Sequence, residues 1–372
     1  MRTTAAPVQI APAALADRLD AHEPLTLLDV RDDASWVIEA PSASLRHVPA
    51  AEALADPAGV AAMLDGPVVA ICNRGITAER VAQALAAEGA DIAVLEGGMR
   101  GWIRLLRATP VKVGVHGLEV LQVQRPGRGC LSYVLAAGGR ALVVDPAPDP
   151  EAYIGFAAQV GAEIVAVVDT HLHADHLSGA RELAHRTAAR LHLPAAALER
   201  GVTYASEVLP IRDGDALDLG GVPIRVISLP GHTTDMTGLL VGERALVGGD
   251  SLFVDGIARP DLQEGDPEGS RKMARLLHRT LHERVLALGD DVVLLPGHTH
   301  PGLPAGPVAA TLGEIRRTVP ELALDEPSDF AEALLADMPP RPANYEAVIA
   351  VNAGRHPYDP DLESGGNSCS TR

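Results

Sequence analysis

The sequence predicts an α/β protein of two domains, an N-terminal parallel sheet with flanking helices and a C-terminal pair of sheets with helices outside them. At about 150 residues per domain, a chain of 372 residues favours two domains. Short apolar runs alternate with helix-like segments in the first part of the chain, which is typical of a parallel sheet. After residue 115, strands joined by Gly-rich turns precede alternating helices and strands, which favours two helix-covered sheets.

Composition and charge exclude several classes of protein. Lys and Arg number 31 against 49 Asp and Glu, so the net charge of −18 argues against a nucleic-acid or anionic-membrane partner. Three cysteines (Cys72, Cys130 and Cys369) are too few for a disulfide framework and favour a reducing compartment. The N-terminus has no apolar signal segment, and no apolar run is long enough to span a bilayer. A cytoplasmic protein is therefore expected.

The N-terminal domain is predicted to occupy residues 8–108. Its expected strands are residues 25–30, 67–71 and 92–95, and its clearest helix is residues 78–88. The segment Cys72-Asn73-Arg74-Gly75-Ile76-Thr77 lies between a strand and a helix. Such a loop can curl its backbone N–H groups around the cysteine sulfur, and the helix N-terminus adds further stabilisation of an anion.

The loop and three further segments resemble the rhodanese family. These segments are Leu28-Asp29-Val30-Arg31, His47-Val48-Pro49 and Gly97-Gly98-Met99-Arg100-Gly101-Trp102. The resemblance implies a rhodanese-like sheet in which Cys72 is catalytic and carries a persulfide sulfur, with Arg74 and Gly75 binding the substrate. The alternative is an inactive rhodanese-like fold in which Cys72 takes no part.

The C-terminal domain is predicted to occupy residues 115–355, after a connector over residues 104–115. A polar, Gly-rich tail over residues 364–372 is expected to be disordered. His278 and His282, four residues apart on a predicted helix, are expected on its solvated face. Expected strands are residues 118–124, 130–136, 141–144, 164–169, 222–229, 237–241, 245–247 and 291–295, with a helix at residues 151–160.

A set of metal-ligand side chains follows the predicted strands of this domain. His171, His173, Asp175 and His176 come directly after an apolar strand. Downstream, His232, Asp250 and His298 each follow a strand-like run and a glycine. Strand ends that present His and Asp at one rim of a sheet can build a metal site.

These residues identify the domain as similar to the metallo-β-lactamase superfamily, through its H-x-H-x-D-H motif. The resemblance implies an αββα metallo-β-lactamase sandwich with metal at the edge between its sheets. In one arrangement His171, His232 and Asp250 hold a single Fe(II), and His173, Asp175, His176 and His298 lie around it. In the other, two ions are bound, as two Zn or a Zn/Fe pair. His171, His173 and His232 hold one ion, Asp175, His176 and His298 hold the other, and Asp250 bridges them. All seven residues are present, so ligand identity does not choose between them.

Two further segments resemble the persulfide dioxygenases of this superfamily. They are residues 251–263, which contain Arg259 and Asp261, and residues 338–352. The resemblance implies oxidation of a small-molecule thiol persulfide by O₂ to sulfite, with Arg259 and Asp261 near the substrate. The alternative for these two residues is an ion pair that braces the ligand loop.

The expected function is therefore a non-heme iron persulfide dioxygenase with sulfur transfer through Cys72. Its partners would be the persulfide and O₂, with neither nucleic acid nor membrane, and a homodimer is common in the superfamily. One alternative is a dinuclear thioester hydrolase of the hydroxyacylglutathione hydrolase type. A third hypothesis is a persulfide-binding regulatory protein with a silent metal site. Cys130 is expected to be a small buried hydrophobe rather than a nucleophile.

Overall fold

The structure is a computed structural model that describes residues 7–34, 37–40, 42–264, 266–304, 306–336, 338–342 and 344–363. The predicted tail over residues 364–372, with Cys369, lies outside the described residues. The chain forms two compact units, the first made mainly of residues 1–106 and the second of most of the remainder. Within the described ranges, no helix is long and apolar enough to cross a membrane.

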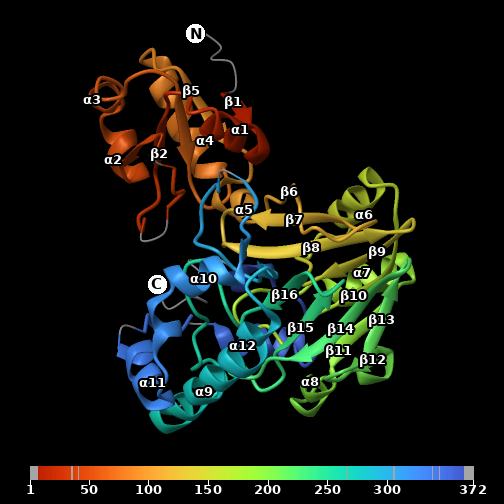
Figure 1. Cartoon of the computed structure of the whole chain (residues 1–372). Coiled ribbons are helices and arrows are strands. Elements are labelled where there is room, and N and C mark those ends of the chain that lie inside the picture. The colour runs from red at the N-terminus through yellow and green to blue at the C-terminus, as the bar shows by residue number, and fades with distance from the viewer. Residues whose placement is uncertain are drawn as a thin grey trace. The chain divides into compact units, whose positions relative to one another are not determined.

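The first unit, coloured red to orange in Figure 1, contains a parallel sheet in the strand order β1-β5-β4-β2-β3. Its strands are β1 (Val8–Ile10), β2 (Thr26–Asp29), β3 (Ser44–His47), β4 (Val68–Ile71) and β5 (Ile92–Leu95). Its helices are α1 (Pro12–Asp20), α2 (Ala50–Ala55), α3 (Pro57–Ala61), α4 (Ile76–Ala87) and α5 (Gly98–Ile103).

The central strands β2, β4 and β5 are buried on both faces of this sheet, because helices pack against both sides. Along β4, Val68 and Ala70 pack with Leu85 of α4 on one face. Val69 packs with Leu15 of α1 on the other face. Two-sided burial explains why the strands are nearly continuous apolar runs, and the predicted parallel sheet with flanking helices is confirmed.

The second unit contains two sheets. The strand orders are β12-β11-β10-β9-β8-β7-β6 and β13-β14-β15-β16-β17-β18 (Figure 1). The first sheet consists of β6 (Arg107–Val111), β7 (Glu119–Arg125), β8 (Cys130–Ala137), β9 (Arg140–Val144), β10 (Glu163–Val168), β11 (Arg190–Pro194) and β12 (Val208–Ile211). The second consists of β13 (Ala216–Leu219), β14 (Val222–Ser228), β15 (Thr237–Val241), β16 (Ala245–Gly249), β17 (Val293–Pro296) and β18 (Ala310–Thr311).

The two sheets face each other across one core, and helices cover their outer faces. Leu135 and Val144 of the first sheet pack in one cluster with Val226 and Val247 of the second. Outside the sheets lie α6 (Pro150–Gln159), α7 (Ala180–Thr187), α8 (Ala195–Glu199), α9 (Pro267–Thr280), α10 (Leu312–Thr318), α11 (Pro327–Ala336) and α12 (Tyr345–Asn352). The helices α6 and α7 contact the first sheet, and α9 and α11 share a core cluster with the second. The expected αββα sandwich is confirmed.

Two local expectations are wrong. Residues 104–115 are not only a connector, because Arg107–Val111 pairs with β7 as the edge strand β6, where Pro110 is tolerated. His278 is not solvated, being only 5% exposed, because α11 covers this side of α9. Its ring lies 5.2 Å from that of Phe330, and its Nε2 is 2.8 Å from the carbonyl oxygen of Leu324.

Candidate metal centre and sulfur-binding loop

The predicted ligands do follow strand ends of the second unit. His171 comes three residues after β10 ends, and His232 comes four residues after β14 ends. Asp250 directly follows β16, and His298 follows β17 by two residues. Gly297 permits the close approach of the last two loops, because a Cβ there would lie 2.4 Å from Asp250 Oδ1.

Three of these residues form a set with the properties of a metal site. One ligand atom from each of His171, His232 and Asp250 lies within 4.8 Å of the others, and all three side chains are at most 1% exposed. The Nε2 atoms of the two histidines lie 3.9 and 3.8 Å from Asp250 Oδ2. These three atoms are buried and have no hydrogen-bond partner. Atoms that share one ion at about 2.0–2.2 Å lie at most about 4.4 Å apart, so the set fits one ion.

The other ring nitrogen of each histidine fixes its tautomer. His232 Nδ1 donates to the carbonyl oxygen of Arg259 at 2.6 Å. His171 Nδ1 lies 3.0 Å from Thr170 Oγ1, whose own hydrogen goes to Asp145 Oδ2 at 2.8 Å. Because a hydroxyl that donates elsewhere can only accept here, His171 also carries its proton on Nδ1. Both Nε2 lone pairs are therefore free to bind a metal.

The charge states at this set also suit a divalent cation. Burial, followed by the neighbouring His173 and His232 rings, places the pKa of His171 well below its usual value, so this ring is neutral. Burial opposes ionisation of Asp250, but His298 and His232 outweigh it and lower the pKa of the carboxyl. Two imidazoles and one carboxylate with open positions are typical ligands of non-heme Fe(II).

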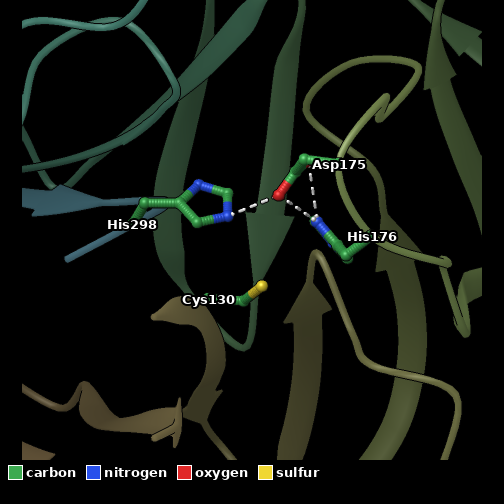
Figure 2. A group of neighbouring side chains, drawn as sticks. All are labelled: Cys130, Asp175, His176 and His298. Carbon is green, nitrogen blue, oxygen red and sulfur yellow. Dashed lines mark hydrogen bonds and ion pairs between the residues drawn. The ribbon is translucent and has the colours of Figure 1, made fainter. Parts of the chain in front are cut away.

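A second group consists of Cys130, Asp175, His176 and His298 (Figure 2). It is closed by direct contacts, since His298 Nε2 lies 2.8 Å from Asp175 Oδ2 and His176 Nδ1 lies 3.1 Å from Asp175 Oδ1. His298 Nδ1 also lies 2.7 Å from Asp250 Oδ1, which links the two groups. Burial opposes the charge, yet His176 and His298 lower the pKa of the Cys130 thiol to about 5.

The expectation for Cys130 therefore needs correction. It is buried as expected, at 7% exposed, but it contacts ionisable side chains instead of only apolar ones. The sequence gives no signal for this, because Cys130 reaches His298 through an isolated antiparallel bridge between segments far apart in the chain.

His173 belongs to a third group, with Asp145 and Asp169. Its Nε2 lies 3.1 Å from Asp145 Oδ1, and its buried Nδ1 has no hydrogen-bond partner. Asp145 also accepts from the backbone N–H of Thr170 at 2.7 Å, so this carboxylate orients both histidines that begin the motif. Asp145 directly follows β9, so the sequence signal for its role is its position at a strand end.

Replacing Asp145 with asparagine should weaken metal binding by about 10- to 100-fold, as loss of a partner of a ligating histidine usually does. Asparagine has a single acceptor oxygen, so it cannot replace the contacts of both carboxylate oxygens with Thr170 and His173. Thr170 would then no longer hold the ring of His171 in its orientation. Competition with a chromophoric chelator measures the affinity. The same change at Asp149, which only caps α6, should leave it unaltered. Equal affinities of D145N and the wild type would contradict this role.

Two distant residues hold the backbone of the motif. Asn352 Nδ2 donates to the carbonyl oxygens of His173 and His176 at 3.0 and 2.8 Å. Asp235 Oδ2 accepts from the backbone N–H of Leu172 at 2.7 Å. Asn352 ends the C-terminal segment that resembles persulfide dioxygenases, whereas no motif marks Asp235.

Arg259 and Asp261 form a buried ion pair. Arg259 is fully buried, with its Nε 2.8 Å from Asp261 Oδ1 and its NH2 group 2.8 Å from the carbonyl oxygen of Pro339. Arg341 also contacts Asp261, at 3.1 Å. This geometry agrees with the ion pair that braces the ligand loop, since the backbone of Arg259 positions His232. Substrate binding by the two residues stays a prediction.

In the first unit, the loop after β4 surrounds the sulfur of Cys72. The backbone N–H groups of Gly75 and Ala78 lie 3.1 and 3.3 Å from Sγ. Arg74 lines a pocket beside Cys72, as do Arg31, Asp32 and Thr77. Gly98 is required because a Cβ there would lie 2.1 Å from the Cys72 carbonyl oxygen. The loop thus provides donors for an anionic sulfur, and the roles of Cys72, Arg74 and Gly75 stay predictions.

Comparison with known families agrees with the division of the chain into two units. Residues 125–298 match the metallo-β-lactamase superfamily, and residues 11–105 match the rhodanese-like domain.

Two kinds of curated protein are among the relatives of this chain. A hydroxyacylglutathione hydrolase of Acidiphilium cryptum is 34% identical over 45% of this chain and 64% of its own length. One from Synechococcus is 33% identical over 53% of this chain and 84% of its own length. The human mitochondrial persulfide dioxygenase ETHE1 is 25% identical over 67% of this chain and 94% of its own length.

Among solved structures, ETHE1 from Myxococcus xanthus superposes with a TM-score of 0.53 at 27% identity. The match covers 63% of this chain and 98% of that structure.

Proposed function

Because the chain belongs to the metallo-β-lactamase superfamily and carries an N-terminal rhodanese-like domain, we propose that it is a persulfide dioxygenase. The outer sulfur of a low-molecular-weight thiol persulfide is oxidised and O₂ is reduced. One persulfide, one O₂ and one water give one thiol, one sulfite and two protons. The similarity to human and bacterial ETHE1 supports this activity.

The observation that carries the proposal is the contrast between the two neighbouring groups. The free nitrogens of His171 and His232 lie 3.9 and 3.8 Å from Asp250 Oδ2, a spacing that one ion can span. The contacts of Asp175 with His298 and His176, at 2.8 and 3.1 Å, are direct hydrogen bonds instead. A first group spaced for one ion, beside a second group that hydrogen bonds already close, supports an Fe(II) site over a dinuclear hydrolytic one.

Fe(II) held by His171, His232 and Asp250 would supply a redox-active ion with adjacent open positions for persulfide and O₂. The chain's own contribution is positioning. The carbonyl oxygen of Arg259 keeps the proton of His232 on Nδ1, and Thr170 does the same for His171. His298 bridges Asp250 and Asp175 and so fixes the orientation of the ligand carboxylate. His171, His232 and Asp250 are each at most 1% exposed, so the ligand set has little contact with solvent.

Oxygen uptake and thioester cleavage separate this function from the hydrolase that other relatives suggest. The full chain, loaded anaerobically with Fe(II), is given the persulfides of glutathione, mycothiol, bacillithiol and coenzyme A in turn. We expect at least one of them to produce O₂ uptake with an equal amount of sulfite. Cleavage of S-lactoylglutathione without O₂ uptake would instead show a hydrolase. If both activities were absent, the regulatory hypothesis would remain.

We further propose that Cys72 transfers sulfane sulfur to or from the same pool of thiols. Its Sγ attacks the outer sulfur of a donor, takes that sulfur as a cysteine persulfide, and releases the donor's remaining sulfur group. The N–H groups of Gly75 and Ala78 are placed to stabilise the anionic sulfur.

Replacing Cys72 with serine should lower sulfur transfer to cyanide at least about 100-fold, because the attacking sulfur is gone. Thiocyanate formation from glutathione persulfide measures the transfer. Met63→Ala, which changes an exposed side chain of the same unit, is the control and should retain the wild-type rate. If C72S transferred sulfur as fast as the wild type, the first unit would have no sulfurtransferase role through this residue.

A further inference from the structure

We propose that Cys130 keeps the metal centre mononuclear, because its side chain occupies the position that a second ion would need beside Asp175, His176 and His298. The inference rests on the proposed function and adds the residue that separates a single-metal oxygenase from a two-metal hydrolase within one fold. Figure 2 shows the sulfur directed toward the same space as the two imidazoles and the carboxylate.

The backbone fixes Cys130 at this place. It begins β8 and forms an isolated antiparallel bridge with His298. On either side of that bridge, Leu131 N donates to Gly297 O at 2.8 Å and Thr299 N donates to Gly129 O at 2.9 Å. The sulfur is therefore held in the group by main-chain pairing, independently of any bound ion.

The side chains of the group contact one another more closely than the ligands of a tetrahedral ion do. In a tetrahedral site with bonds of about 2.0 Å, ligand atoms lie about 3.3 Å apart. The contacts of Asp175 with His298 and His176 are shorter, at 2.8 and 3.1 Å. Cys130 completes the group through side-chain hydrogen bonds with both histidines, so the buried charges are satisfied by one another.

Cys130 could instead act as a fourth ligand, because thiolate, imidazole and carboxylate together suit Zn²⁺. The two hypotheses predict opposite effects of removing the sulfur. If Cys130 excludes an ion, a smaller side chain opens the position while Asp175, His176 and His298 remain, and metal content rises. If Cys130 is a ligand, the wild type holds two ions and the variant loses one.

The test compares the full-length wild type with C130A and C130S after removal of metal and loading with Mn²⁺ alone. Metal per chain is counted by mass spectrometry, and the electron paramagnetic resonance spectrum shows whether the ions are isolated or spin-coupled. We expect about one isolated ion in the wild type and in C130S, whose hydroxyl can replace the hydrogen bonds. C130A should bind about twice as much and show a spin-coupled pair. Cys72→Ala, a cysteine change in the other unit, should leave the count unchanged.

Two ions in the wild type would overturn the inference without the need for any variant. It would also be overturned if folded C130A, verified by circular dichroism, still bound one ion. The proposed function fails differently, through the absence of persulfide-dependent O₂ uptake in an iron-loaded wild type that binds a single ion.

Discussion

Replacing His232 with alanine should reduce iron affinity more than about 100-fold. Loss of a residue that only hydrogen-bonds to a metal ligand usually costs up to about 100-fold, and loss of a ligand itself should cost more. His232 supplies one of three buried ligand atoms, and its Nε2 has no other partner. The remaining pair, His171 and Asp250, holds an ion through two atoms only. Persulfide-dependent O₂ uptake should disappear together with the iron.

His116→Ala is a matched control, because His116 is an exposed histidine of the same unit. It should retain wild-type iron and O₂ uptake. Iron content after anaerobic reconstitution and gel filtration is the direct measurement. H232A that still held one iron and consumed O₂ would contradict the assigned ligand set. Loss of O₂ uptake in H232A, by contrast, would rule out the regulatory hypothesis, since a silent site has no activity to lose.

Replacing Arg259 with alanine should destabilise the second unit by about 3–5 kcal/mol, the cost of breaking a buried ion pair by removing one partner. Asp261 would keep a mostly buried carboxylate with only Arg341 beside it. The carbonyl oxygens of Pro339 and Pro340 would lose their donor. Because the backbone of Arg259 also orients His232, iron affinity should fall as well.

Denaturant unfolding measures the stability change, and R259K separates charge from geometry. Lysine keeps the charge but lacks the planar fork that reaches Asp261 and both carbonyls together, so we expect only partial recovery. Arg225→Ala breaks an exposed ion pair with Glu243 and should cost at most about 1 kcal/mol. An R259A protein as stable as R225A, with altered KM alone, would show that Arg259 serves the substrate instead of the loop.

The strand ends made the metal ligands predictable from sequence. The motif from His171 to His176 follows an apolar run, and the later ligands His232, Asp250 and His298 each follow another. Because sheet edges gather strand ends, the spacing alone indicated one site. The parallel sheet of the first unit was equally visible, since burial on both faces leaves continuous apolar runs such as residues 67–71.

The division of these ligands into groups could not be predicted, because it depends on pairing between distant segments. Cys130 joins Asp175 and His298 through a backbone bridge that no local pattern encodes. The burial of His278 likewise depends on α11, which lies far along the chain from α9. Periodicity shows which face of a helix is apolar, but not whether a later helix covers the other side.

Metal content per chain in anaerobically purified protein shows whether the three-ligand site holds a single ion while the neighbouring group stays closed. About one iron per chain, and little zinc, is the predicted result. Two ions per chain, as zinc or a zinc–iron pair, would contradict the account and favour hydrolysis of a thioester by the same residues.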